Sequence, residues 1–217
     1  MTTAMVGGAT GLVGGELLNL LLEQPEYERV VALVRRPLSR SHPKLAQAVV
    51  DFDRLEEQAE AFRVDDVYCC LGTTIKKAGS QAAQRRVDFE YPLTMARLAA
   101  GAGARRYLLV SSIGADTKSA IFYCRLKGEV EAAVAAAGVP AIHIFRPALL
   151  LGHRQEHRPG ERIAVALSPL YAPFLPARYR PIAARDVAQA MVNVALGADE
   201  AGTRIYLNDE VQRLARR

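Results

Sequence analysis

The stretch Ala4-Met5-Val6-Gly7-Gly8-Ala9-Thr10-Gly11-Leu12-Val13-Gly14 sets three glycines three residues apart, directly after a short apolar run. It is followed by Glu16-Leu17-Leu18-Asn19-Leu20-Leu21-Leu22, whose leucines suit a helix packed on a sheet. The sequence therefore predicts a strand, a tight turn and a helix in succession. In that context a Gly-x-x-Gly-x-x-Gly pattern indicates a dinucleotide-binding turn.

The three glycines of this turn have different expected tasks. Gly8 permits the tight turn, Gly11 lets the backbone approach a pyrophosphate, and Gly14 allows the helix to pack closely on the strand. The pyrophosphate would lie at the helix N-terminus, where unpaired N–H groups and the helix dipole favour negative charge. The expected cofactor contacts in the turn are Gly8, Thr10, Gly11, Leu12, Val13 and Gly14.

Beyond the turn, apolar runs alternate with helical patterns along most of the chain. Strands are expected over 29–34, 48–52, 66–71, 107–110, 141–145 and 204–207, and helices over 55–62, 88–101, 121–137 and 184–196. This alternation predicts an α/β fold with a doubly wound parallel sheet of Rossmann type in three α/β/α layers. Crowded prolines predict that residues 148–183 form an irregular C-terminal cap on the substrate side of one domain, residues 1–217.

Composition narrows the class of protein. Half of the 217 residues are hydrophobic, and no apolar run approaches the roughly 20 residues that a membrane-spanning helix needs. The first residues run into the glycine turn with no targeting segment, so a cytoplasmic location is expected. The net charge of +5 favours anionic ligands, but no basic stripe is interleaved with aromatics. Neither nucleic acid, membrane nor metal is an expected partner, since the cysteine spacing also fits no zinc site.

The end of the second expected strand bears on the choice of cofactor. A site that prefers NAD usually has an acidic residue there for the ribose 2′-hydroxyl, whereas this chain has Arg35 and Arg36. Guanidinium groups can clamp a 2′-phosphate with forked, charge-assisted hydrogen bonds, which favours NADP over NAD. The alternative is that both arginines are solvated loop residues.

Two later strand ends would line the same cleft, because ligands of such sheets lie beyond the carboxyl ends of the strands. Asp51 and Phe52 are expected to meet the adenine. Leu71, Gly72 and Thr73 are expected to line the pyrophosphate and ribose. Either stretch would equally serve as an ordinary junction between strand and loop.

The residues that could move a proton follow the strand 107–110. That strand ends in Ser111-Ser112, and the next expected helix carries Tyr123 and Lys127 four residues apart on one face. A lysine ammonium stabilises a neighbouring phenolate, and a serine hydroxyl can hold a substrate oxygen. Hydride transfer to a carbonyl needs this acid–base set, although Tyr and Lys at this spacing are otherwise usually a surface pair.

Several stretches match one family together. They are Gly8-Ala9-Thr10-Gly11, Cys69-Cys70-Leu71-Gly72-Thr73-Thr74, Lys77-Ala78-Gly79, Ser111-Ser112, Gly114-Ala115-Asp116, residues 123–129, Phe145-Arg146-Pro147 and Arg154-Gln155-Glu156. On these stretches the chain resembles the atypical short-chain dehydrogenases/reductases, in particular the Tat-interactive oxidoreductase-like proteins and their bacterial relatives. The resemblance covers most of the chain and loses definition between about 168 and 182, where the substrate pocket is expected.

The resemblance implies a role for each residue of the acid–base set. Tyr123 would be the general acid, Lys127 its ribose-binding partner, and Ser112 the group that orients the carbonyl, with Ser111 still open for that task. It also implies that Leu150 and Arg158 approach the nicotinamide end of the cofactor or the substrate. Members near this subgroup include regulators.

Two hypotheses of function follow. The first is an NADP-dependent oxidoreductase that passes a hydride between nicotinamide and a small carbonyl or alcohol substrate, with Tyr123 handling the proton. The second is a non-catalytic NADP(H) sensor that acts through a protein partner. A sugar-nucleotide epimerase would use the same residues, but the region after Arg146 is short for enclosing such a substrate. A homodimer is compatible with this fold, and no feature of the sequence shows the interface.

Overall fold

The central sheet of the computed structural model, which describes residues 2–152, 175–198 and 201–217, is wholly parallel. Among these residues its strands are β1 (Thr2–Gly7), β2 (Tyr27–Val34), β3 (Leu45–Val49), β4 (Asp66–Cys69), β5 (Arg106–Val110), β6 (Ala141–Arg146) and β9 (Gly202–Leu207). They lie in the order β3-β2-β1-β4-β5-β6-β9. The chain thus winds outward from β1 to one edge and then restarts at β4, so the predicted doubly wound topology is confirmed.

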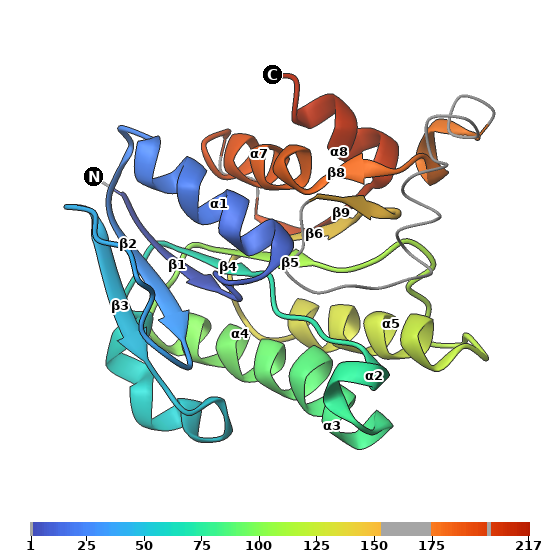
Figure 1. Ribbon diagram of the computed structural model, residues 1–217, viewed down its shortest axis with the longest axis horizontal. Coiled ribbons are helices and arrows are strands. Elements are labelled where there is room, and N and C mark those ends of the chain that lie inside the picture. The colour runs from blue at the N-terminus through green and yellow to red at the C-terminus, as the bar shows by residue number, and fades with distance from the viewer. Residues whose placement is uncertain (1, 153–174, 199–200) are drawn as a thin grey trace.

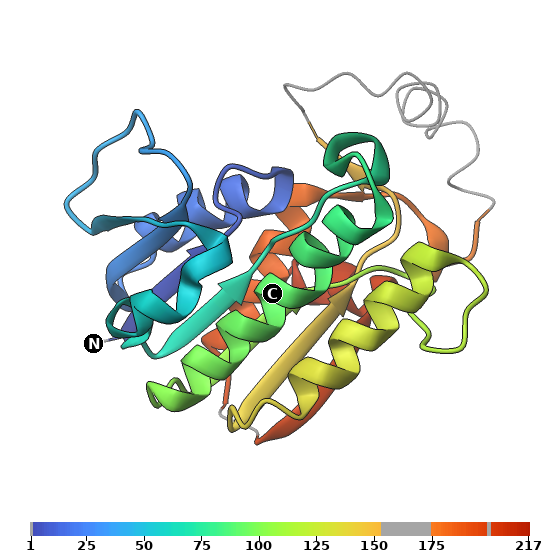
Figure 2. The same ribbon diagram turned by 90° about the horizontal axis from the view of Figure 1, so that it is seen from below.

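Helices cover both faces of the sheet, as Figure 1 shows. On one face lie α1 (Leu12–Glu23), α7 (Ala184–Ala195) and α8 (Asn208–Leu214). On the other lie α4 (Tyr91–Gly101), α5 (Phe122–Ala135) and the 3₁₀ run η1 (Phe52–Phe62), with α4 and α5 side by side in Figure 2. The predicted three-layer α/β/α arrangement is therefore confirmed.

The alternation of side chains along β1 explains the two cores. Ala4 and Val6 belong to a buried cluster with the helices on one face, and Met5 belongs to the cluster on the other. In β2 every residue from Val30 to Val34 is buried, as expected of an internal parallel strand covered on both faces. His143 of β6 is 5% exposed, with its Nδ1 3.0 Å from the Tyr206 hydroxyl.

Some expected boundaries are wrong. The strand predicted over 48–52 is β3, which ends at Val49, because Asp51 instead caps η1 by accepting a hydrogen bond from the Asp53 N–H at 3.0 Å. The helix predicted over 88–101 is preceded by α2 (Ile75–Ala78), α3 (Gln81–Arg85) and the π-helical turn η2 (Arg86–Glu90). Asp88 therefore lies inside a helical run instead of at its start.

The segment predicted as a cap has regular structure at its two flanks. Strands β7 (Leu150–Leu151) and β8 (Ile182–Ala183) pair in parallel, and a short turn η4 (Ala177–Tyr179) precedes β8. The buried Asn208 holds both flanks, because its Oδ1 accepts from the Ala148 N–H at 2.9 Å and its Nδ2 donates to the Arg180 carbonyl at 2.9 Å. Residues 153–174 of the predicted cap lie outside the described residues.

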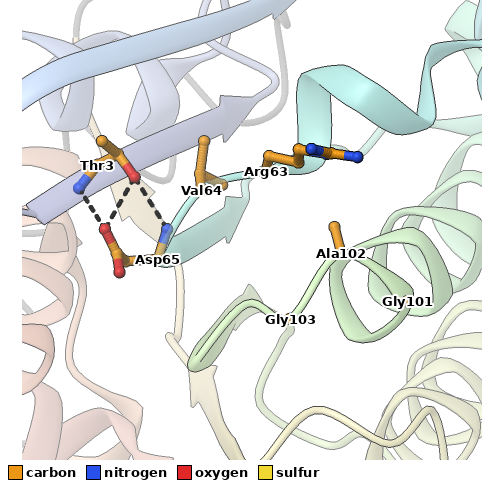
Figure 3. A pocket seen from close by; sticks show the side chains of 7 residues that line it. All are labelled: Thr3, Arg63, Val64, Asp65, Gly101, Ala102 and Gly103. Atoms are coloured by element: carbon orange, nitrogen blue, oxygen red, sulfur yellow. Dashed lines mark hydrogen bonds between the residues drawn. The ribbon is translucent and has the colours of Figure 1, made fainter.

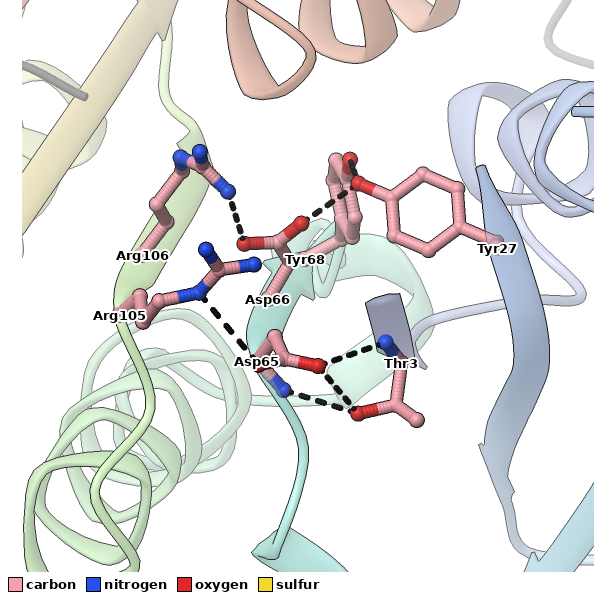
Figure 4. Close-up of polar contacts among 7 residues, drawn as sticks. All are labelled: Thr3, Tyr27, Asp65, Asp66, Tyr68, Arg105 and Arg106. Atoms are coloured by element: carbon pink, nitrogen blue, oxygen red, sulfur yellow. Dashed lines mark hydrogen bonds and ion pairs between the residues drawn. The ribbon is translucent and has the colours of Figure 1, made fainter. Parts of the chain in front are cut away.

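A network of buried hydrogen bonds lies at the amino ends of the strands (Figure 4). The Tyr27 hydroxyl donates to Asp66 Oδ2 at 2.6 Å and lies 2.8 Å from the Tyr68 hydroxyl, while Arg106 Nη1 donates to Asp66 Oδ1 at 2.8 Å. Burial raises the pKa of Asp66, although the hydrogen bonds from Tyr27 and Arg106 oppose it. This network joins β2, β4 and β5 at their starts.

A shallow hollow opens at the same end of the sheet (Figure 3). Its lining residues are Thr3, Arg63, Val64, Asp65, Gly101, Ala102 and Gly103. Thr3 donates to Asp65 Oδ2 through its N–H at 2.7 Å and its hydroxyl at 2.8 Å, so these two polar side chains satisfy each other. The hollow contains none of the predicted site residues. None of the helices in the described ranges is long and apolar enough to cross a membrane.

Candidate functional site

The glycine turn between β1 and α1 has the geometry that its sequence predicts. Gly8 has a φ of +83°, and a Cβ on it would lie 2.6 Å from the Cys70 carbonyl oxygen. A Cβ on Gly14 would overlap the Gly8 carbonyl oxygen, and the Gly11 N–H donates to that same oxygen at 2.8 Å. Any side chain at Gly8 or Gly14 would therefore force the turn, α1 and the end of β4 apart.

The N-terminus of α1 fits a phosphate group. Gly11 is its N-cap residue and has no capping side chain, and the first amide bonded back into the helix is that of Gly15, which donates to Gly11 at 2.8 Å. The amides of residues 12–14 precede it, at the positive end of the helix dipole. Thr10 is exposed, Leu12 half-buried and Val13 buried, so Leu12 and Val13 offer backbone N–H groups to a ligand.

Arg35 and Arg36 directly follow β2, and Gly7 at the end of β1 is aligned with Leu33 of β2, so both arginines lie at the same edge of the sheet as the glycine turn. Arg35 and Arg36 are both exposed. Within residues 2–152, 175–198 and 201–217, neither guanidinium has an ion-pair or hydrogen-bond partner. Arg40 differs, because its Nη1 donates to Asn19 Oδ1 of α1 at 2.5 Å.

Two further predicted contacts lie at the ends of β3 and β4. Phe52 is only 7% exposed and packs against the Tyr91 ring, with centroids 5.4 Å apart, so Asp51 is the more accessible of the proposed adenine contacts. After β4, Gly72 is exposed and Leu71 and Thr73 are half-buried. The Cys70 N–H donates to the Gly7 carbonyl at 2.9 Å, which brings this stretch beside the glycine turn.

Tyr123 and Lys127, the predicted acid–base pair, lie near one another in the first half of α5. Lys127 Nζ lies 5.8 Å from the centroid of the Tyr123 ring, and Tyr123 is 37% exposed whereas Lys127 is 3% exposed. Burial alone would lower the pKa of Lys127, but the charges of Tyr123 and Asp88 outweigh it and raise that pKa above its usual value. Lys127 is therefore held as a buried ammonium beside an accessible phenol.

The two serines after β5 have different partners. Ser111 is 5% exposed, and its hydroxyl donates to Glu131 Oε1, a carboxylate that also accepts from Arg146 Nε at 3.0 Å. Ser112 is half-buried, and its hydroxyl makes only a long 3.3 Å hydrogen bond to the Ile113 carbonyl. Ser112 has the hydroxyl that is more available to a ligand.

Asp88 is a site residue that the sequence analysis missed. It lies in the π-helical turn η2, its side chain is 1% exposed, and its Oδ1 lies 2.9 Å from Lys127 Nζ. Its Oδ2 accepts from the Thr73 N–H at 2.9 Å, so one carboxylate joins the acid–base pair to the loop after β4. The sequence signal was misleading, because an acidic residue at an expected helix start is ordinarily explained by the helix dipole.

Of the remaining predicted residues, the structure describes only Leu150. Leu150 of β7 is half-buried against the core cluster to which Leu12 also packs. A Cβ on Gly152 would lie 2.6 Å from Leu12 Cδ1, so the chain after β7 lies directly on the first residue of α1. Arg158 falls outside the described residues. The described part of the chain contains no group of three potential metal ligands.

Comparisons with known proteins agree with this geometry. Residues 8–196 match the family model described as NAD(P)H-binding. Protein HTATIP2 of Rattus norvegicus is 44% identical over 161 residues, which cover 72% of this chain and 66% of the rat protein, just under two thirds of its length. Protein FMP52, mitochondrial, of Eremothecium gossypii is 32% identical over 217 residues, covering 98% of this chain and 97% of that protein.

Solved structures share the fold at low sequence identity. MoeE5 in complex with UDP-glucose and NAD has a TM-score of 0.72 at 17% identity, covering 100% of this chain and 81% of that one. A GalE-like L-threonine dehydrogenase from Cupriavidus necator, in its holo form, has a TM-score of 0.69 at 17% identity, covering 100% and 89%. Together with the uncapped phosphate turn, the family match and the HTATIP2 relative show that this chain belongs to the NAD(P)H-binding family, as an HTATIP2-like member with a Rossmann fold.

Proposed function

We propose that this protein is an NADP-dependent oxidoreductase that transfers a hydride between nicotinamide and a carbonyl or alcohol carbon, with Tyr123 as the proton donor and acceptor. The observation that carries the proposal is the pairing of an exposed phenol with a buried, charged lysine. Lys127 is fixed by Asp88 at 2.9 Å and faces the Tyr123 ring at 5.8 Å. A phenol so placed can exchange a proton with a substrate while its ionised form is stabilised.

The residues at the carboxyl ends of the strands fit the parts of the cofactor. Backbone N–H groups of the glycine turn would hold the pyrophosphate at the start of α1. Arg35 and Arg36, exposed and unpaired within the described ranges, would hold the 2′-phosphate. Thr73 and Lys127 would lie at the nicotinamide ribose, because Asp88 ties them together. The bound cofactor supplies the hydride-accepting or hydride-donating carbon.

The chain's own residues then account for the proton. During reduction the Ser112 hydroxyl holds the carbonyl oxygen, and the Tyr123 hydroxyl gives its proton to that oxygen as the hydride reaches the carbon. Lys127 stabilises the phenolate that remains, and solvent returns the proton to Tyr123. Alcohol oxidation follows the same path in reverse, with Tyr123 as the base.

The test begins with cofactor binding and ends with turnover. The Kd values of NADPH and NADH are measured by fluorescence titration for the wild type and for Arg35→Ala, followed by a broad screen of carbonyl substrates for NADPH oxidation. We expect tighter binding of NADPH, a loss of that preference in Arg35→Ala, and turnover that depends on Tyr123. Equal affinity for both cofactors would contradict the NADP assignment.

A second function, a non-catalytic NADP(H) sensor acting on a protein partner, is favoured by one observation. The Asp88 carboxylate lies 2.9 Å from Lys127 Nζ and offsets part of the positive charge that would otherwise stabilise a Tyr123 phenolate. Tight NADPH binding without turnover across the whole substrate screen would support the sensor over the enzyme.

Two properties of the whole protein stay predictions. Two similar proteins, from Coccidioides immitis and Eremothecium gossypii, are 37% and 32% identical to this chain and are named mitochondrial. The sequence of this chain instead predicts a cytoplasmic location. Cell fractionation of the tagged chain tests the location. Light scattering of the purified protein tests the proposed homodimer.

A further inference from the structure

We propose that Gln47 is a positioning residue for cofactor choice, and that it holds the loop bearing Arg35 and Arg36 in the shape that receives a 2′-phosphate. We call residues 35–40 the arginine loop. This inference rests on the NADP preference proposed above and adds the residue that prepares the phosphate site.

Both polar atoms of the Gln47 side-chain amide form hydrogen bonds with the arginine loop. It lies on the edge strand β3, aligned with Ala32 of β2, and its side chain reaches back over the loop that joins the two strands. Its Oε1 accepts from the Leu38 N–H at 2.7 Å, and its Nε2 lies within donating distance of the carbonyls of Leu38 at 3.4 Å and Arg40 at 3.3 Å. The pairing of β2 with β3 is made by the backbone, so the sheet itself does not require these side-chain bonds.

Further anchors fix the loop beyond the two arginines. Leu38 is half-buried against the core cluster under α1, and Arg40 donates to Asn19 Oδ1 at 2.5 Å. Lys44 donates to the Gln24 carbonyl at the end of α1 at 2.6 Å. The arginine loop is therefore held at Leu38 and Arg40, and the chain that follows it is held at Lys44. The guanidinium groups of Arg35 and Arg36 are unpaired among the described residues.

The charge of this region suits an anion. Between Glu28 and Asp51 the sequence contains no acidic residue, whereas it contains Arg29, Arg35, Arg36, Arg40 and Lys44. No carboxylate of the loop itself can then compete with a phosphate for the two exposed guanidinium groups. A forked, charge-assisted pair with a phosphate is the contact that arginine makes best.

Order in the loop before binding has a specific consequence for affinity. A loop that is already in its bound shape loses little conformational freedom when the ligand arrives, so more of the interaction appears as affinity. Only NADPH has a 2′-phosphate for Arg35 and Arg36 to contact, so only NADPH gains from this order. Loosening the loop should therefore weaken NADPH binding and leave NADH binding almost unchanged.

The test compares NADPH and NADH affinities in Gln47→Ala, Gln47→Glu and the wild type, with Gln81→Ala as a control at an exposed glutamine on α3. We expect Gln47→Ala to raise the Kd of NADPH on the order of fivefold and to change that of NADH by less than about twofold. Gln47→Glu keeps the acceptor for the Leu38 N–H, loses the donor and adds a negative charge. It should weaken NADPH binding further, whereas Gln81→Ala should change neither Kd.

A double-variant comparison separates positioning from a general structural role. If Gln47 acts through the arginines, Gln47→Ala should have no further effect on NADPH affinity in the Arg35→Ala, Arg36→Ala background. If Gln47→Ala weakens the binding of NADPH and NADH equally, the inference is overturned. It is also overturned if the wild type prefers NADPH and the ratio of the two Kd values is the same in Gln47→Ala. A wild type that binds both cofactors equally would remove the phosphate site itself, which fails the NADP assignment and the inference together.

Discussion

The two ends of the central sheet both contain a buried ion pair, but the polar groups around the two pairs differ in the part of the chain that the structure describes. At the amino end Arg106 and Asp66 are 2.8 Å apart, with side chains 7% and 1% exposed. At the carboxyl end Lys127 and Asp88 are 2.9 Å apart, with side chains 4% and 1% exposed. By distance and burial the two pairs are almost the same.

The difference lies in what surrounds each pair. Around Asp66, hydrogen bonds run in a chain from the Tyr68 hydroxyl through the Tyr27 hydroxyl to the carboxylate, so both hydroxyls have partners inside the network. Around Lys127, the Tyr123 phenol is exposed and the first amides of α1 have no side-chain cap. A buried ion pair thus does not identify a functional site by itself, whereas unspent hydrogen-bonding capacity beside it does.

The largest expected effect comes from removing one hydroxyl at each end. Tyr123→Phe should lower turnover by about 10² to 10⁴-fold, because the proton donor is lost, and leave the free energy of unfolding nearly unchanged. Tyr27→Phe should do the reverse, leaving turnover intact and lowering the free energy of unfolding by about 1–3 kcal/mol through the unpaired Asp66 oxygen. Steady-state kinetics measures the turnover of both variants, and urea unfolding measures their free energies of unfolding. Unimpaired turnover in Tyr123→Phe would remove the proposed acid.

The next largest effect is expected on stability alone, at the hydrogen-bonded network around Asp66. Arg106→Met leaves the Asp66 carboxylate buried without its cation, so the free energy of unfolding should fall by about 3–5 kcal/mol. NADPH affinity of the folded variant should stay at the wild-type value. Adding Asp66→Leu should recover part of the stability, and a change in the Kd of NADPH would show that the two ends are coupled.

Asp88→Asn tests the other ion pair and has a defined pH dependence. The side chain keeps an acceptor for Thr73 but loses its charge, which together with that of Tyr123 raises the pKa of Lys127, so stability should fall by about 1–3 kcal/mol at pH 7. Because folding raises that pKa above its ordinary value of 10.5, the stabilisation is complete below this value and is lost as pH rises through the folded pKa. The difference in unfolding free energy between wild type and variant should therefore stay constant up to about pH 10 and narrow as pH rises above 10.5 in urea unfolding. A difference that does not narrow above pH 10.5 would show that Lys127 is not its source.

The smallest effect is expected at the hollow of Figure 3. Burial alone would raise the pKa of Asp65, but the hydrogen bonds from Thr3 and the charge of Arg105 lower it overall. The stabilisation is therefore present above the ordinary value of 3.8 and is lost as pH falls through the lower folded pKa. Asp65→Asn should cost less than about 1 kcal/mol at pH 7, and the cost should shrink as pH falls below 3.8, in urea unfolding. A cost that does not change as the solution is acidified would assign the effect to shape and not to charge.

The fold could be predicted from the sequence because its signals are local. Glycines at fixed spacing, apolar runs of strand length and leucine spacing in α1 each act within a few residues, and together they determine the layers and the sheet topology. The end of β3 was misplaced because two signals competed at Asp51. Its apolar neighbours favoured a strand, and its side chain instead capped the following 3₁₀ run.

The site could be predicted only in part, because hydrogen-bond partners are set by residues distant in the chain. Sequence places Ser111 and Ser112 at one strand end, and Glu131, twenty positions beyond Ser111, is what occupies the first hydroxyl. Asp88 was hidden because a π-helical turn carries it into the interior, and no spacing rule marks such a turn. Arg35 and Arg36 could be identified from the sequence, whereas the hydrogen bonds that hold their loop could not.

The contact between Leu12 and Gly152 makes two distant positions share one volume. The backbone at Gly152 lies outside the left-handed region, so its lack of a side chain reflects the leucine that fills the space and not a conformation that only glycine adopts. Changes at the two positions should then be acceptable mainly in pairs, one growing as the other shrinks. Among relatives this exchange would appear as covariation between the first residue of α1 and the residue that follows β7. An engineer who changes Gly152 must therefore also choose the residue at Leu12.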